Sequence, residues 1–222
     1  MFRFVNYDKP GKGIEPDAPK KRPFFLFLEL FFRKLFTIMQ MNVVYLICCI
    51  PIFTIGPATA GMTHIFREIS EERPIFIWND FRKAMKTHFK QGFLVWLINM
   101  VLWSFLLLDA FILYSQPSVI TMILLGLLGI IVIVFAMMQL YLYPLLITGR
   151  YTVLDIYKNA FLLALSKIYQ TLGILVIVAL VSWGLYSVPF LSLFLLAFFY
   201  FATVNFISVF YADRILKQFN MR

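Results

Sequence analysis

Three stretches of the chain are strongly apolar and contain no lysine or arginine: residues 35–66, 92–149 and 168–213. All 20 lysines and arginines lie in the four segments around these stretches. About 20 residues cross the hydrocarbon core of a bilayer as a helix, so the second and third stretches are each long enough for two crossings. The pattern predicts membrane-spanning helices whose basic connections lie on one side.

Short polar breaks divide the second and third stretches into pairs of helices. The breaks are "YSQPS" at residues 114–118 and "YSVP" at residues 186–189, and both contain the Pro and Ser typical of turns. Because basic residues stay on the cytoplasmic side, both hairpins are expected to begin and end there. The predicted spans cover about 92–114, 119–148, 168–186 and 190–212.

The first stretch is interrupted by "PIFTIGPATAG", residues 51–61. A single crossing here would place one basic segment outside, whereas a hairpin keeps both inside. We therefore predict a limb over about 24–50, a turn at Pro51 and a short helix over about 57–71 that returns from the outer side and crosses only in part. A single crossing is the alternative.

A helix this short within a membrane must be shielded by other helices, and small residues allow neighbouring helices to approach closely. The sequence is rich in such residues around the turn. The residues expected to form the turn and the packing surface are Pro51, Gly56, Pro57, Ala58, Ala60 and Gly61.

Two basic connectors show helical periodicity. Residues 78–91 place aromatic side chains on one face and basic side chains on the rest, which predicts an amphipathic helix in the cytoplasmic interface. Residues 153–167 form a similar connector. The first of these helices is a candidate surface for binding either lipid or a partner protein, through Trp78, Phe81, Arg82, Lys83, Lys86 and Lys90.

Composition agrees with a membrane location. The chain is 62% hydrophobic and only 14% charged, so a soluble fold could not cover its apolar surface. The net charge of +9 is explained by the topology of a membrane protein rather than by nucleic-acid binding. Residues 1–23 are expected to be a cytoplasmic arm, 24–212 a single transmembrane domain, and 213–222 a cytoplasmic tail.

Candidate chemistry is sparse. Asp109 is the acid within the apolar spans, and it is a candidate for ion coupling or simply for solvation near the outer turn. Polar residues within the spans are expected to form interhelical hydrogen bonds: Gln40, Asn42, Asn99, Gln139 and Asn205. No catalytic motif, metal-binding pattern or cofactor-binding loop is present in the sequence, so we expect a protein that is not an enzyme and has no cofactor.

Three segments carry a resemblance to a known family that covers nearly the whole chain. They contain the motif "PIFTIGPATA" at residues 51–60, the motif "WNDFRKAMKTHFKQ" at residues 78–91 and the run "KNAFLLALSK" at residues 158–167, and they resemble the YesL-like family of bacterial membrane proteins, domain of unknown function 624. The resemblance implies an integral protein of the bacterial cytoplasmic membrane, whose genes often lie beside those of carbohydrate ABC transporters. It implies no established reaction.

The expected fold is an all-α polytopic transmembrane bundle of three helical hairpins, the first partly re-entrant, with amphipathic cytoplasmic connectors and both termini in the cytoplasm. The expected function is that of an accessory or assembly subunit, bound to membrane lipid and to the permease subunits of a sugar ABC transporter. A small stand-alone transporter or channel is the alternative, and a membrane enzyme ranks third.

Overall fold

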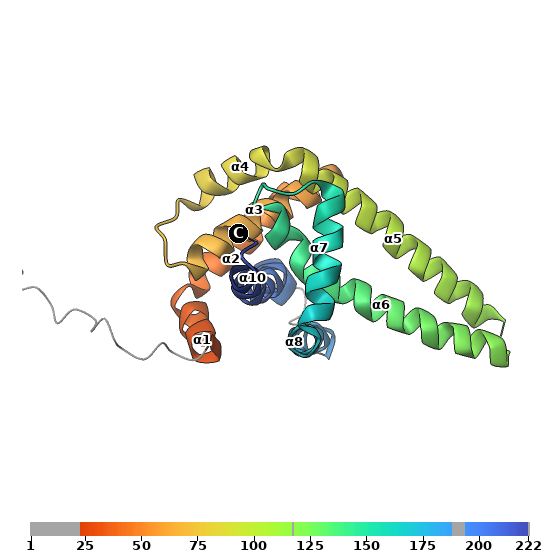
Figure 1. The fold of residues 1–222 in the computed structure, drawn as a ribbon. Coiled ribbons are helices and arrows are strands. Elements are labelled where there is room, and N and C mark those ends of the chain that lie inside the picture. The colour runs from red at the N-terminus through yellow and green to blue at the C-terminus, as the bar shows by residue number, and fades with distance from the viewer. Residues whose placement is uncertain (1–22, 117, 188–193, 222) are drawn as a thin grey trace, which may run out of the picture.

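The computed structural model describes residues 23–116, 118–187 and 194–221, and this part of the chain is helical and contains no strand. This confirms the all-α class (Figure 1). The elements, in chain order, are α1 (Pro23–Arg33), α2 (Leu35–Cys48), η1 (Ile52–Thr54), α3 (Ile55–Ser70), α4 (Ile77–Thr87), α5 (Phe89–Ser115), α6 (Val119–Leu146), α7 (Val153–Ser166), α8 (Ile168–Ser187), the π-helical turn η2 (Leu196–Tyr200) and α10 (Phe201–Gln218).

Three helices of the described chain are long and apolar enough to cross a bilayer: α5, α6 and the continuous helix Leu196–Gln218. A fourth candidate is the pair α7 and α8, which is bent by 99°. The chain is therefore a multi-pass membrane protein by helix length and composition. The expected limb over 24–50 is two helices, because the chain breaks at Lys34 between α1 and α2. The turn at 186–189 lies partly outside the described residues.

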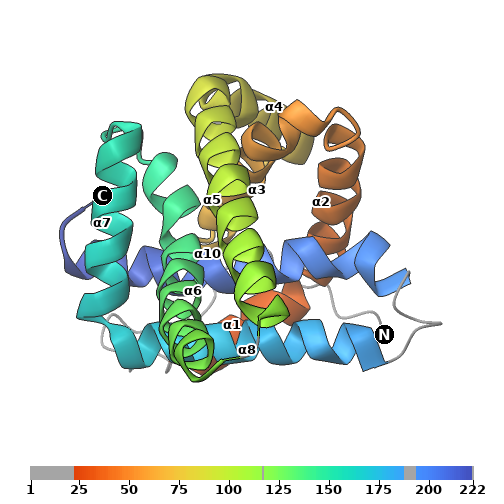
Figure 2. The same ribbon diagram turned by 90° about the vertical axis from the view of Figure 1, so that its right-hand side faces the viewer.

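The α5–α6 hairpin stands apart from the rest of the molecule. In Figure 1 its two helices run side by side away from the other elements. There α8 and α10 are seen end-on, whereas Figure 2 shows them lengthwise. The α5–α6 hairpin therefore runs in a different direction from α8 and α10. Large apolar side chains on the projecting part of α5–α6 are exposed, including Phe105, Phe111 and Ile123, as expected for a surface that meets lipid.

Helix α3 lies at the centre of the fold. Eleven of its 16 residues are buried, and it packs against α2, α4, α5, α6 and α10. The hydroxyls of Thr59 and Thr63 donate to carbonyls of the preceding turn, those of Ile55 and Thr59. Its polar side chains are thus satisfied away from lipid, as a short helix among longer ones requires.

Two glycines allow α3 and α5 to touch. A Cβ atom added to Gly56 would lie 2.1 Å from the carbonyl oxygen of Gly92 and 2.6 Å from Cβ of Trp96. Any side chain at Gly56 would therefore collide with backbone, which cannot move aside as a side chain can. The start of α3 is fixed directly against the first turn of α5.

Helix α4 returns along α3 in the opposite direction. The ring of Phe81 lies against Gly61, where an added Cβ would be 3.0 Å from the ring atoms. Phe81 is 1% exposed. The chain therefore leaves the end of α3, runs back along α4, and begins α5 beside the start of α3.

This arrangement corrects one sequence prediction. The turn before α3 was expected on the outer side, across the membrane from residues 67–90. The contact between Gly56 and Gly92 instead places that turn at the same end of the molecule as Lys90 and the start of α5. The chain does turn back after α2, as predicted. The periodicity of residues 78–91 fits an interfacial helix equally well, but the structure packs α4 along α3.

We expect Gly56→Ala to lower the free energy of unfolding by roughly 1–3 kcal/mol, because the methyl group has no space beside the Gly92 carbonyl. Gly126→Ala is the matched control, since nothing lies within 4 Å of its added Cβ on α6. That change should be neutral or stabilising by up to about 1 kcal/mol, through helix propensity. Denaturant unfolding of the detergent-solubilised protein measures both. Equal stability of the two variants would contradict the close contact.

Candidate functional site

A cavity of about 410 Å³ lies among the helices, and it is here called the central cavity. It lies between α2, α3, α5, α6, α8 and α10. Among the residues that the structure describes, no charged side chain lines it. Its wall combines apolar and aromatic side chains with uncharged polar groups, and the polar residues are Tyr45, Thr59, Gln139, Tyr143, Tyr200, Asn205 and Ser208.

Hydrogen bonds between helices hold these polar groups in place. The amides of Gln139 on α6 and Asn99 on α5 donate to each other, at 3.1 and 3.2 Å. Asn205 on α10 pairs with the Thr63 hydroxyl on α3. Each amide has more donors and acceptors than these bonds use, so polar capacity remains at the cavity wall. The prediction of interhelical bonds is confirmed for Asn99, Gln139 and Asn205.

Asn42 stabilises the irregular turn that forms another part of the wall. Its side chain is fully buried, and its Nδ2 donates to the carbonyls of Leu196 and Ala197, at 3.0 and 2.6 Å. Its Oδ1 accepts from the backbone N–H of Ala202 at 2.9 Å. A π-helical turn changes the regular backbone pairing, and Asn42 satisfies three of the groups around it. The turn ends at Tyr200, which lines the cavity. Gln40, on the same helix, is exposed.

A buried ion pair lies beside the cavity. Arg67 Nε on α3 lies 3.0 Å from Asp213 Oδ1 on α10, and the two side chains are only 6% and 4% exposed. Arg67 Nη2 also donates to the carbonyl of Pro144 at 2.6 Å, and Pro144 lines the cavity. At the end of α6, Thr148 N–H bonds to Leu145 instead of Pro144, so Arg67 satisfies a carbonyl outside the regular helix ladder.

Further charges extend this pair toward the surface. Lys217 Nζ lies 3.2 Å from Asp213 Oδ2 and 2.9 Å from Glu71 Oε1, while Arg73 lies 2.9 Å from Glu71 Oε2. The cluster joins the ends of α3 and α10. Residues 213–222 were predicted to be a tail, but α10 continues to Gln218 and Asp213 is part of the interior.

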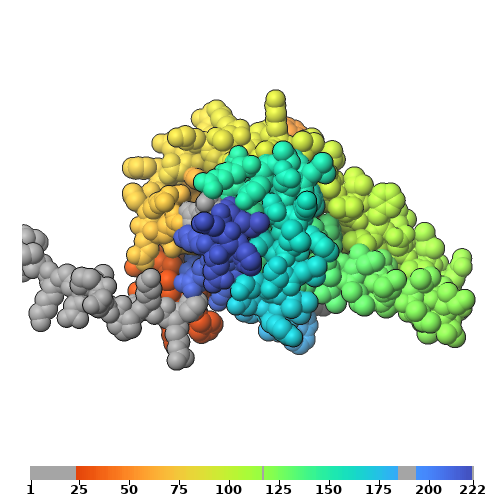
Figure 3. Space-filling view, in the orientation of Figure 1, coloured from red at the N-terminus to blue at the C-terminus, as the bar shows by residue number. Residues whose placement is uncertain are grey.

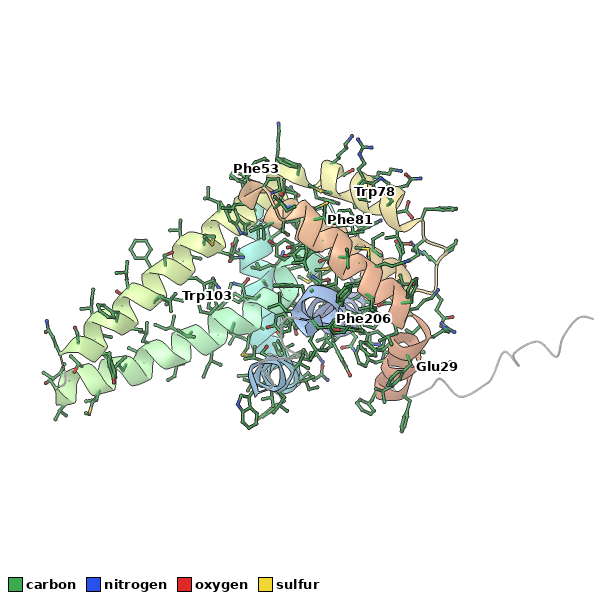
Figure 4. All side chains as sticks on the ribbon, turned by 180° about the vertical axis from the view of Figure 1, so that it is seen from behind. Glu29, Phe53, Trp78, Phe81, Trp103 and Phe206 are labelled. Carbon is green, nitrogen blue, oxygen red and sulfur yellow. The ribbon has the colours of Figure 1, made fainter. Side chains whose placement is uncertain are left out.

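The structure divides the predicted docking residues of the first connector. The prediction that Phe81 belongs to an exposed docking surface is wrong, because this side chain is buried against α3 (Figure 4). Lys90 is exposed but belongs to α5. The remaining residues are exposed on α4, and we call them the outer face of α4: Trp78, Arg82, Lys83 and Lys86. The N-terminus of α4 is capped by Asp80, whose Oδ2 accepts from the Phe76 N–H at 2.7 Å.

His88 at the junction of α4 and α5 adds no positive charge to this region at neutral pH. Burial lowers the pKa of His88 below its ordinary value, and nearby His64 and Arg67 lower it further. The charge of the outer face of α4 therefore comes from arginine and lysine.

The other predicted residues are distributed as follows. Pro51 is exposed, whereas the rest of the predicted turn and packing set is buried: Gly56, Pro57, Ala58, Ala60 and Gly61. Asp109 lies on an exposed side of α5 and does not line the central cavity. Among residues 23–116, 118–187 and 194–221, no group of three or more His, Cys, Asp or Glu residues could hold a metal ion.

Residues 38–110 match the family model described as "Protein of unknown function, DUF624". This confirms the resemblance to that family over these residues. The match covers most of α2, all of α3 and α4 and most of α5, and so includes both glycines of the contact between Gly56 and Gly92. No curated protein and no solved structure matches the chain.

We expect Asp213→Asn to destabilise the fold by about 3–5 kcal/mol, because the buried Arg67 guanidinium would lose its carboxylate partner without losing its charge. Glu72→Gln is the control, since it removes an exposed ion pair with Arg33 and should cost less than about 1 kcal/mol. Thermal unfolding in detergent compares them. Similar losses in both variants would show that the interior pair is not the dominant electrostatic contact.

Proposed function

We propose that this protein is a non-enzymatic subunit of the bacterial cytoplasmic membrane that assists or assembles with the permease subunits of a carbohydrate ABC transporter. The observation that supports it is the exposed outer face of α4, whose opposite side is buried against α3. The connection to carbohydrate uptake rests on the family resemblance alone. In this proposal both termini lie in the cytoplasm.

The outer face of α4 has the composition of a protein-binding surface. Trp78 is 56% exposed, and Arg82 follows one helical turn later. Tryptophan and arginine are enriched among the residues that contribute most to protein–protein binding. Phe81 packs the opposite side of α4 against α3, so the helix is already ordered before a partner binds. Binding therefore loses little conformational entropy of the backbone of α4.

Anionic lipid is the other possible ligand of this face. Basic residues attract acidic headgroups by about 1 kcal/mol each near a membrane surface. A helix that lies in the interface usually buries its apolar side in lipid, however, and on α4 that side, including Phe81 and Ala84, is buried within the protein. We therefore favour a protein partner for α4, while lipid covers the exposed part of α5–α6.

A stand-alone transporter or channel is a second candidate, and the observation that favours it is the central cavity. This candidate predicts that the isolated protein catalyses uptake when reconstituted in liposomes. The accessory function predicts no uptake without the permease subunits.

We expect Trp78→Ala with Lys83→Ala to reduce co-purification of permease subunits at least about tenfold, while membrane insertion is unchanged. Trp183→Ala with Lys158→Ala is the matched control, because it removes the same two side-chain types from exposed positions on α8 and α7. A pull-down in mild detergent with quantitative mass spectrometry measures the yield. Wild-type yield from the first variant, or an equal loss from both, would contradict docking through α4.

A further inference from the structure

We propose that the central cavity binds a neutral amphiphile from the bilayer, a molecule with a hydroxyl head and an apolar chain. This inference goes beyond the proposed function and does not depend on it. The cavity volume of about 410 Å³ falls within the range of small-molecule pockets.

The polar part of the wall selects a head group that forms hydrogen bonds and carries no charge. Gln139 and Asn205 each present an amide, and Ser208 presents a hydroxyl, from α6 and α10. A hydroxyl head can donate to and accept from such groups. A charged head would meet no opposite charge among the described residues of the wall, and leaving an ion unpaired in such surroundings is costly.

The apolar part of the wall suits a chain. Trp103 on α5 and Leu140 on α6 line the cavity together with Leu175 and Val178 on α8. Trp103 is fixed by an edge-on contact with Phe135, at 5.3 Å between ring centroids. Figure 4 shows Trp103 between α5 and α6, where the hairpin leaves the rest of the fold.

The location of the cavity favours a ligand that arrives from lipid. Its wall includes α5, α6 and α10, which are three candidate membrane spans. The space-filling surface in Figure 3 shows α5 and α6 extending beyond the packed helices. A head group that reaches the cavity through the hydrocarbon core should itself be uncharged, as the wall also requires.

The π-helical turn gives the cavity a defined shape. Tyr200 ends that turn, lines the cavity and shares a hydrogen bond of 2.9 Å with Ser182 on α8. Asn42 does not line the cavity and acts through the backbone of the turn. It is therefore a positioning residue for this wall.

The experiment uses the protein in nanodiscs with Trp103 as its single tryptophan, through Trp78→Phe, Trp96→Phe and Trp183→Phe. Bromine quenches tryptophan fluorescence at short range, so 11-bromo-1-undecanol serves as the neutral probe. We expect saturable quenching of Trp103 by this alcohol. Two probes with the same chain, 1-bromoundecane without a head group and 11-bromoundecyl-trimethylammonium with a cationic one, should give only weak quenching that rises linearly with concentration.

Two serines provide a matched pair of variants. Ser208 lines the cavity and donates to the Val204 carbonyl, whereas Ser104 is exposed on α5, outside the cavity, and donates to the Met100 carbonyl. Ser208→Ala should weaken the apparent affinity for the alcohol about fivefold, and Gln139→Leu should weaken it at least as much. Ser104→Ala should leave it unchanged.

Equal, linear quenching by all three probes would overturn the proposal, because the cavity would then be an ordinary lipid-exposed surface. Absence of quenching by the alcohol would also overturn it. If the single-tryptophan protein does not fold, as judged by size-exclusion chromatography, the same titrations on the wild-type protein and on Trp103→Phe yield the Trp103 contribution by difference. A saturable component that is equal in both would again contradict the assignment.

Discussion

The fold depends on the close contact between Gly56 and Gly92. Because neither residue has a side chain, the first turn of α3 meets the first turn of α5 directly, and an added methyl group at Gly56 would lie 2.1 Å from a backbone oxygen. This contact decides where the projecting α5–α6 hairpin begins relative to the rest of the protein. It also places the turn after α2 beside the basic residues that precede α5. The antiparallel pair α3 and α4 lies at that end of the hairpin (Figure 1).

Polar side chains then fix the helices around α3. In an apolar setting an unpaired polar group is costly, so each such group selects one arrangement of the helices. Asn42 satisfies the backbone at the π-helical turn, the amides of Asn99 and Gln139 join α5 to α6, and Arg67 and Asp213 join α3 to α10. Of these residues only Gln139 also lines the central cavity, whose wall lies between the spans. The interior is thus held together by a small number of polar side chains.

The sequence predicted the individual helices better than their relative placement. Charge segregation and the break at "YSQPS" located α5 and α6 closely, and the small residues near Pro57 correctly indicated a buried α3. The pairing of Gly56 with Gly92 was not predictable from local pattern, because the two residues are far apart in the chain and either glycine alone is compatible with many neighbours. The role of Phe81 was misjudged for a related reason. The sequence pattern of an apolar helix face is the same whether that face contacts lipid or protein. For Phe81, the contact with Gly61 on α3 shows that the face contacts protein. The buried pair of Arg67 and Asp213 was likewise not predictable, because the sequence pattern places one in the short helix 57–71 and the other in the tail 213–222.

Because Gly56 touches Gly92, we expect the turn after α2 and the start of α5 to lie on the same side of the membrane. This expectation is tested most directly by cysteine labelling at Phe53 and Lys90, both exposed, in a background with Cys48→Ser and Cys49→Ser. Phe53→Cys and Lys90→Cys are each treated with a membrane-impermeant maleimide, in intact cells and in inverted membrane vesicles. The structure predicts that both positions react in the same preparation and are protected in the other. Labelling of position 53 from one side and position 90 from the opposite side would contradict it.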